Sequence, residues 1–111
     1  MRIEISARHF RASDNLKQFA EDEIMRLKKY YDGIIDCKIV FEKQRENRSC
    51  EVDLKVFGTV LNARMTTDDH FKSVVGVVDK LERQIRKYKT RMHNQRYKRD
   101  DRVLEEKAAS A

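Results

Sequence analysis

The chain has 111 residues, 40% of them charged, and a formal charge of +6. This length favours one domain with a single modest core, and the basic balance favours a soluble protein that binds polyanions. No apolar run approaches the roughly 18 residues that a membrane span needs, and the alternating N-terminus does not resemble a signal peptide. We therefore expect a cytoplasmic protein that does not contact membranes.

Residue types that carry chemistry are sparse. The two cysteines, Cys37 and Cys50, are too few and too far apart for a zinc site, and in the cytosol we expect them to be buried free thiols. The three histidines, His9, His70 and His93, share no spacing, so we expect no metal. No P-loop, nucleophile elbow or pair of catalytic carboxylates is recognisable. We therefore expect neither a cofactor nor a small-molecule substrate.

The first third of the chain predicts a strand followed by a helix. Residues 1–8 alternate apolar and polar side chains, as a half-buried strand does. Ser13 is a suitable N-cap, apolar residues then keep helical spacing as far as Tyr31, and Gly33 is a plausible left-handed C-terminal cap. Three cations occupy the last turn, where they complement the negative end of the helix dipole: Arg26, Lys28 and Lys29.

The middle of the chain predicts a meander of three strands. Residues 35–42, 50–57 and 61–66 alternate with a period of two. The polar stretch 43–49 is expected to be a loop, and Gly58 to form a tight turn. The side chains expected to face the core from the first of these strands are Ile35, Cys37, Ile39 and Phe41.

A second long helix is predicted from Thr67, its expected N-cap, to about Arg96. Its expected covered face is one apolar arc: Phe71, Val74, Val75, Val78, Leu81, Ile85, Tyr88 and Met92. The opposite arc carries like charges that repel one another and that an anionic partner would compensate: Lys80, Arg83, Lys87 and Arg91. Ten basic and three acidic residues lie between Lys80 and Arg102, so the excess positive charge of the chain is concentrated there.

The predicted fold class is α+β. The order β-α-β-β-β-α favours a two-layer sandwich in which both helices pack on one face of a mainly antiparallel four-stranded sheet. Residues 1–96 are expected to form this domain, and residues 97–111, basic and then polar, a disordered tail. The open sheet face should carry mixed charge, which makes the helical face the better binding surface.

Residues 67–89 closely resemble the signature of the ribosome hibernation factors, the family of hibernation promoting factor, ribosome-associated inhibitor and sigma-54 modulation protein. The most specific part is Asp-Lys-Leu-Glu-Arg-Gln at residues 79–84, followed by an aliphatic residue and alternating cations. The resemblance covers residues 1 to about 92 and implies a fold like that of double-stranded RNA-binding domains. His70 and Phe71 depart from the family's commonest pattern, which has a tyrosine here, so no polar role is carried over to Phe71.

The resemblance implies binding to the small ribosomal subunit and its 16S rRNA, within the 70S ribosome. The site would be the decoding centre, where the factor overlaps the paths of messenger RNA and of transfer RNA in the A and P sites. Translation would be inhibited by occupancy in stationary phase or stress, by a protein that is monomeric off the ribosome. The expected rRNA-binding residues are Lys80, Arg83, Arg86, Lys87, Lys89, Arg91, Lys28 and Lys29.

Three local features have two interpretations each. Gly76 allows either close helix–sheet packing or a close approach to RNA. Tyr30, Tyr31 and Tyr88 are either aromatics at the rim of the core or platforms for stacked bases. The acidic residues that precede His70 either imitate a nuclease site or simply begin a helix.

Two other functions compete with ribosome hibernation. A generic double-stranded RNA-binding or ribosomal protein would bind any long duplex, and a nuclease would require a metal. Long family members continue into a second domain that dimerises ribosomes, so this chain is expected to be a short form or the N-terminal domain of a long one. Whether ribosomes are paired or only silenced, and whether other factors cooperate, does not follow from the sequence.

Overall fold

The computed structural model describes the backbone of residues 1–100 and the side chains of residues 1–90. The elements in order are β1 (Arg2–Arg8), α1 (Asp14–Tyr30), β2 (Ile34–Gln44), β3 (Asn47–Val56), β4 (Thr59–Thr67) and α2 (His70–Asp100). This order is the predicted one. The end of the second helix, expected near Arg96, lies at Asp100, and the remainder of the predicted tail, 101–111, falls outside the described residues.

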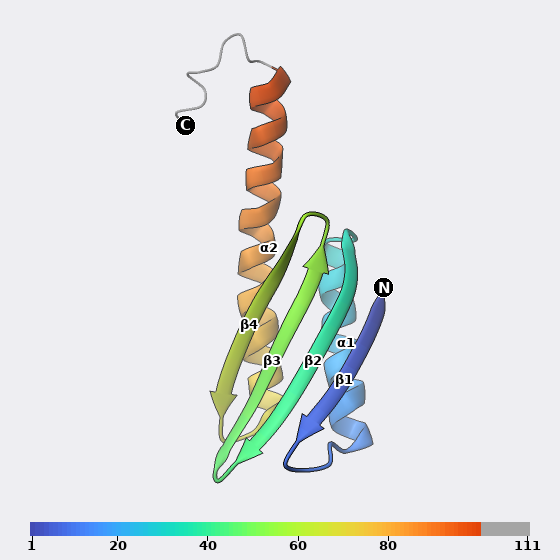
Figure 1. Cartoon of the computed structure of the whole chain (residues 1–111), viewed down its shortest axis with the longest axis vertical. Helices are drawn as coiled ribbons and strands as arrows, with labels where there is room; N and C mark the ends of the chain where they lie inside the picture. Colours follow the sequence, from blue (N-terminus) through green and yellow to red (C-terminus); the bar gives the residue numbers. More distant parts are fainter. Residues whose placement is uncertain (101–111) are drawn as a thin grey trace.

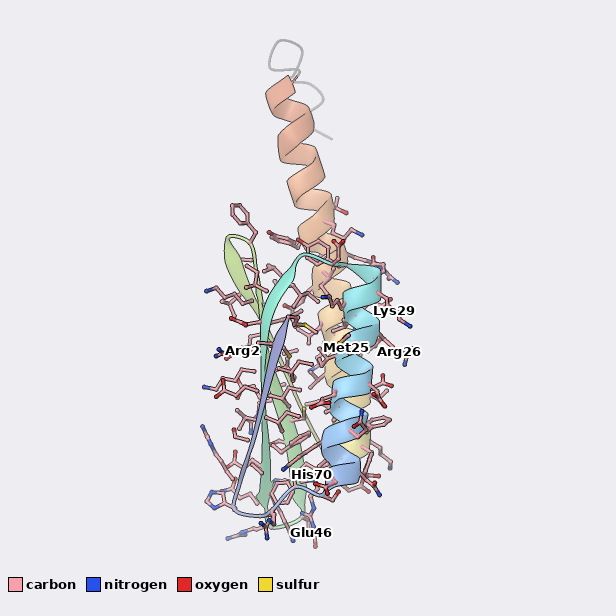
Figure 2. All side chains as sticks on the ribbon, turned by 90° about the vertical axis from the view of Figure 1, so that its right-hand side faces the viewer. Arg2, Met25, Arg26, Lys29, Glu46 and His70 are labelled. Carbon is pink, nitrogen blue, oxygen red and sulfur yellow. The ribbon has the colours of Figure 1, made fainter. Side chains whose placement is uncertain are left out.

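The sheet has the strand order β1-β2-β3-β4, with β1 parallel to β2 and the other neighbours antiparallel. Helix α1 is the crossover between the two parallel strands, which places it on one face of the sheet. Helix α2 lies beside α1 on the same face, so the predicted two-layer α+β architecture is confirmed (Figures 1 and 2). Both helices run in the same direction, and α2 continues past the end of the sheet (Figure 1).

The core lies between these two layers. The largest side chains without exposed surface are Phe41, Leu54, Leu81 and Ile85, from β2, β3 and α2, and α1 adds Leu16, Ala20, Ile24 and Leu27. Cys37 and Cys50 are buried and free, as predicted. Burial raises the pKa of each thiol to about 12, so both stay protonated and unreactive at neutral pH.

Two details of the β2–β3 hairpin differ from prediction. Ile34 is buried while Ile35 is 46% exposed, because a bulge between Ile34 and Asp36 shifts the alternation by one residue. The prediction that residues 43–49 form a loop is also wrong. Gln44 pairs with Asn47, so the polar residues there extend the hairpin, whose turn includes Arg45 at φ 59°.

Of the two turn glycines, Gly58 behaves as predicted and Gly33 does not. Gly58 has a φ of +86° in the β3–β4 turn. Helix α1 ends at Tyr30, and its C-cap is Tyr31, which is extended and donates its backbone N–H to the carbonyl of Leu27 at 2.8 Å. Gly33 is needed for space, because a Cβ there would collide with the ring of Tyr31.

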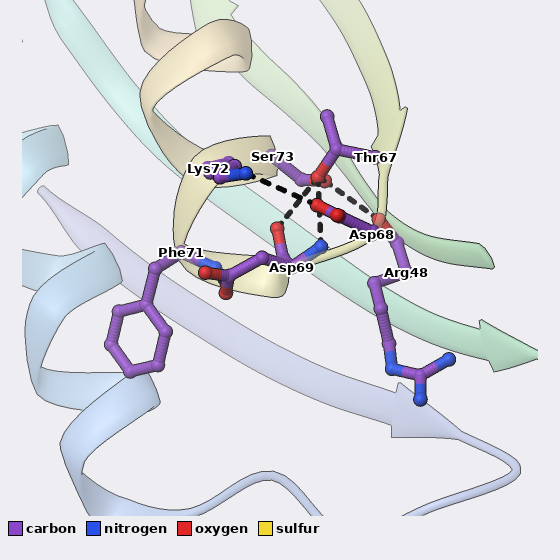
Figure 3. A network of polar contacts seen from close by, with 7 residues as sticks. All are labelled: Arg48, Thr67, Asp68, Asp69, Phe71, Lys72 and Ser73. Atoms are coloured by element: carbon purple, nitrogen blue, oxygen red, sulfur yellow. Dashed lines mark hydrogen bonds and ion pairs between the residues drawn. The ribbon is translucent and has the colours of Figure 1, made fainter. Parts of the chain in front are cut away.

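The cap of α2 is Asp69 and not Thr67 (Figure 3). Thr67 is the last residue of β4. The Asp69 carboxylate accepts the backbone N–H of Phe71 at 2.9 Å, and its carbonyl accepts that of Ser73 at 3.0 Å. The Thr67 hydroxyl accepts the Asp69 N–H at 3.1 Å and so holds the turn before the helix. The helix therefore begins three residues later than predicted.

The covered face of α2 is rotated relative to the predicted arc. Phe71 and Val75 are 39% and 51% exposed, whereas Val77 and Ser73 are fully buried. The buried Ser73 hydroxyl donates to the Arg48 carbonyl at 2.6 Å, which turns this polar residue toward the sheet. An arc drawn through apolar residues alone missed it. The side chain of Met92, also placed in that arc, lies outside the described residues.

Gly76 lies on the side of α2 that packs against Met65 of β4. A Cβ at this position would lie 2.6 Å from Cε and 3.0 Å from Cγ of Met65 on β4. Such distances are far below ordinary carbon–carbon contacts, so a larger residue would force the Met65 side chain to repack. The geometry supports the helix–sheet packing interpretation of this glycine.

We expect Gly76→Val to lower the free energy of unfolding by about 1–3 kcal/mol, the usual cost of overpacking. Urea denaturation followed by circular dichroism measures this loss. The matched control is Lys72→Val on an exposed position of the same helix, where valine costs only about 0.5 kcal/mol in propensity. Equal stability of the two variants would contradict close packing of α2 on Met65.

Candidate nucleic-acid interface

Basic residues occupy the last turn of α1 and the stretch 83–89 of α2. The two segments are neighbours because both helices run in the same direction and α2 continues past the end of α1 (Figure 1). The negative end of the α1 dipole favours Lys28 and Lys29 in its last turn, whereas residues 83–89 lie well before the end of α2 at Asp100. Figure 2 shows Arg26 and Lys29 on the outer surface of α1. We define the basic ridge as six of the predicted rRNA-binding residues: Lys28, Lys29, Arg83, Arg86, Lys87 and Lys89.

Contacts between the two helices join the two halves of the basic ridge. The ring of Tyr30, the last residue of α1, lies 4.6 Å from Nζ of Lys89 and 6.0 Å from Cζ of Arg86. Both are cation–π distances. The structure thus brings the end of α1 together with the second half of α2, as the prediction of a shared patch requires.

Two arginines of the basic ridge have acidic partners one turn earlier in α2. Arg83 pairs with Asp79 at 2.7 Å and Arg86 pairs with Glu82 at 3.0 Å. All four side chains are well exposed, so each pair is worth only about 0.3–0.5 kcal/mol. Either guanidinium can therefore exchange its carboxylate for a phosphate at little cost.

Lys80 lies apart from the other predicted residues. Its ammonium donates to the Arg64 carbonyl at 2.8 Å, and Gln84 donates to the Asn62 carbonyl at the same distance. These two side chains cover backbone carbonyls of β4, the edge strand of the sheet. The predicted stripe is thus divided between the basic ridge and the edge of β4, and the rRNA role of Lys80 stays a prediction. The side chain of Arg91, also predicted to bind, lies outside the described residues.

The open face of the sheet has mixed charge, as predicted. Arg64 lies 3.5 Å from Glu51 and 4.0 Å from Glu42, and Asn62 donates to both Glu51 and Asp53. A polyanion would meet these carboxylates as well as the cations. The helical side of the molecule is the better candidate for its binding.

The three tyrosines at this end of the core, Tyr30, Tyr31 and Tyr88, do not share one role, and the sequence did not distinguish Tyr30 from the other two. Tyr88 is only 6% exposed and donates its hydroxyl to the Phe57 carbonyl, and Tyr31 packs edge-on against it with ring centroids 6.0 Å apart. These two are core-rim aromatics. Tyr30 is 39% exposed and its ring faces cations instead. Its position in the basic last turn of α1 was the only available signal.

The acidic residues before His70 do not converge on a common site. Asp69 caps α2, and Asp68 pairs with Lys72 at 3.3 Å (Figure 3). His70 is buried, stacks on Phe10 with ring centroids 4.6 Å apart, and bonds through Nε2 to the Glu42 carbonyl at 3.1 Å. Within the part of the chain that the structure describes, no three His, Cys, Asp or Glu residues are grouped to hold a metal ion. The helix-start interpretation accounts for both aspartates.

The described helices include none with a stretch long and apolar enough to span a bilayer.

A model of the family described as Sigma 54 modulation protein / S30EA ribosomal protein matches residues 3–93. The chain belongs to this family. A ribosome hibernation promotion factor of Lactococcus lactis is 35% identical over 99 residues, which cover 84% of this chain and 52% of that protein. A ribosome hibernation promoting factor of Azotobacter vinelandii is 27% identical over 89 residues, or 80% of this chain and 83% of that one.

Solved structures support the same family fold. A ribosomal subunit interface protein from Coxiella burnetii matches with a TM-score of 0.77 and 28% identity, covering 81% of this chain and 99% of that one. The chain spans about half the length of the curated relatives from Lactococcus lactis and Deinococcus radiodurans that it matches.

We expect the stability of the fold to fall as the pH drops below about 6.5, the ordinary pKa of histidine. Burial lowers the pKa of His70 in the folded chain, so below that pH the unfolded chain binds a proton that the folded chain does not. The loss is complete once the pH is below the folded pKa. Urea midpoints at several pH values between neutrality and mild acid measure it.

The control for this pH dependence is His70→Gln, whose amide can still donate to the Glu42 carbonyl but does not titrate. It should lose less stability than the wild type over the same pH range, because carboxylates contribute equally to both chains. Parallel pH profiles of the two proteins would contradict the assignment to His70.

Proposed function

We propose that this protein is a ribosome hibernation factor that binds the small ribosomal subunit through 16S rRNA. At the decoding centre it would overlap the paths of messenger RNA and of transfer RNA in the A and P sites. It would thereby inhibit translation by cytoplasmic 70S ribosomes in stationary phase or stress. The observation that supports this most is the basic ridge, which joins the last turn of α1 to residues 83–89 of α2 in a chain of the Sigma 54 modulation protein / S30EA family.

The physics of the basic ridge suits rRNA. Its six cations are presented by rigid helices, and phosphate contacts release counterions, so affinity falls steeply with salt. The ridge offers charges on one convex side and a mixed face on the other, which orients the molecule on a polyanion. Recognition would follow the shape and backbone of folded RNA rather than a base code in a helix groove.

Inhibition of this kind requires no bond to be made or broken. The acidic residues near His70 are engaged in capping and ion pairing, and the relatives named above are hibernation factors. A bound domain that fills the channel for messenger and transfer RNA is sufficient to stop decoding. The proposal therefore assigns the protein a non-catalytic role.

The proposal is tested by co-sedimentation of the purified chain with vacant ribosomes through sucrose, at low and moderate salt, with a random RNA duplex as competitor. We expect binding that survives excess duplex and that is carried by the small subunit when the subunits are separated. Loss of binding at stoichiometric duplex would instead identify a generic double-stranded RNA-binding protein. The same gradients show whether ribosomes pair.

The double variant Arg83→Glu with Lys87→Glu should lose subunit binding, because it reverses two outward charges of the basic ridge. In titrations where weaker binding is still measurable, the slope of log K against log salt should become shallower by about 1.4–1.8, since each of the two lost phosphate contacts contributes roughly 0.7–0.9. Circular dichroism should show an unchanged fold.

The matched control reverses two exposed cations on the open sheet face, Arg2→Glu with Lys38→Glu, and so changes the net charge by the same amount. It should retain most of the affinity. Equal losses in the two double variants would mean that net charge alone drives binding, and no loss in the ridge variant would remove the proposed site.

A further inference from the structure

Tyr30 is an exposed aromatic residue with cations at its ring, and packing of the core does not account for this arrangement. It ends α1, and more than a third of its surface is exposed. Single exposed aromatics are ordinary on protein surfaces. What sets this one apart is that two cations from α2 approach its ring, while its neighbour Tyr31 turns inward to pack on Tyr88.

The charges around Tyr30 are held in place. Arg86 is paired with Glu82 at 3.0 Å, and its pKa is raised first by a hydrogen bond to the Tyr30 hydroxyl and then by the nearby Glu82. Lys89 also lies 5.9 Å from the ring of Tyr31, so its ammonium sits between two aromatic rings. Lys29 precedes Tyr30 on α1 and is exposed. The result is an accessible aromatic ring enclosed by positive charge.

This combination is the one used to bind single-stranded nucleic acid. Aromatic rings stack on unpaired bases whatever their identity, while adjoining cations bind the phosphates on either side. Two cations lie against this one exposed ring, and duplex RNA keeps its bases stacked inside the helix, where the ring could not reach them. An unpaired nucleotide of folded RNA matches both the ring and the charges.

We propose that Tyr30 is the stacking platform for one unpaired nucleobase of the bound RNA, with Lys89, Arg86 and Lys29 binding the adjoining phosphates. This inference rests on the proposed function and deepens it. It divides the basic ridge into an end that reads an exposed base, at Tyr30, and a stretch that binds backbone only, at Arg83 and Lys87.

The chain contains no tryptophan, so Tyr30→Trp introduces a single indole whose fluorescence a stacked base quenches. The probes are a short oligoadenylate and inorganic polyphosphate of matched charge. We expect quenching by oligoadenylate and little by polyphosphate. The matched control is Phe71→Trp, at a residue that is also 39% exposed but lies at the opposite end of the molecule, and it should respond to neither probe.

A second measurement uses vacant small subunits and the otherwise native chain. Tyr30→Leu should bind roughly 5- to 100-fold more weakly, the effect expected from losing one stacked base, while Tyr30→Phe keeps the ring and should bind like the wild type. Phe71→Leu is the control and should not change the affinity.

The outcomes separate this inference from the function on which it rests. Quenching by both probes alike, no quenching by oligoadenylate, or wild-type affinity of Tyr30→Leu would overturn the stacking site. If Tyr30→Leu binds normally while the Arg83 and Lys87 charge reversal abolishes binding, the proposed function stands without the stacking site. If neither variant changes binding, the proposed rRNA surface itself is overturned.

Discussion

The burial of one face of α2 on β3 and β4 is the constraint on which the rest of the structure depends. Leu81 and Ile85 have no exposed surface, and Gly76 lets the helix approach Met65 without a side chain between them. This packing fixes the rotation of α2 about its axis. The rotation in turn decides which cations face outward, which reach α1, and which, like Lys80, lie over the edge of β4.

The shared direction of the two helices brings their basic segments together in the basic ridge. Helices α1 and α2 run in the same direction on one face of the sheet, and α2 continues past the end of α1 (Figure 1). The basic last turn of α1 therefore lies beside residues 83–89 of α2. Like charges brought together in this way repel, and the weak pairs of Arg83 with Asp79 and Arg86 with Glu82 only partly offset the repulsion. A polyanion that lies against the ridge would relieve this repulsion.

The strand alternation and the element order were predictable because they depend on local properties of the chain. Alternating apolar and polar residues mark the strands, and Ser13 caps α1 through a residue only three positions away. Errors arose wherever a tertiary contact overruled the local pattern. The bulge at Ile35 depends on pairing with β3. A Cβ at Gly33 would meet the ring of Tyr31, so this glycine is explained by a side-chain contact and not by its own backbone conformation. Ser73 is buried because a strand carbonyl accepts its hydroxyl hydrogen, which no count of apolar residues reveals.

By itself the sequence determined the fold class, the family resemblance and the location of the excess charge in the second half of α2, since these depend on periodicity, motif and composition. Only the tertiary structure decided how that charge is divided. Helical spacing places Lys80 on one stripe with Arg83 and Lys87, but the neighbours of α2 differ on its two sides, an edge strand at Lys80 and the end of α1 at Lys89. The partner of a side chain across a tertiary contact lies far away in sequence, so Tyr30 acquired its cations only through folding.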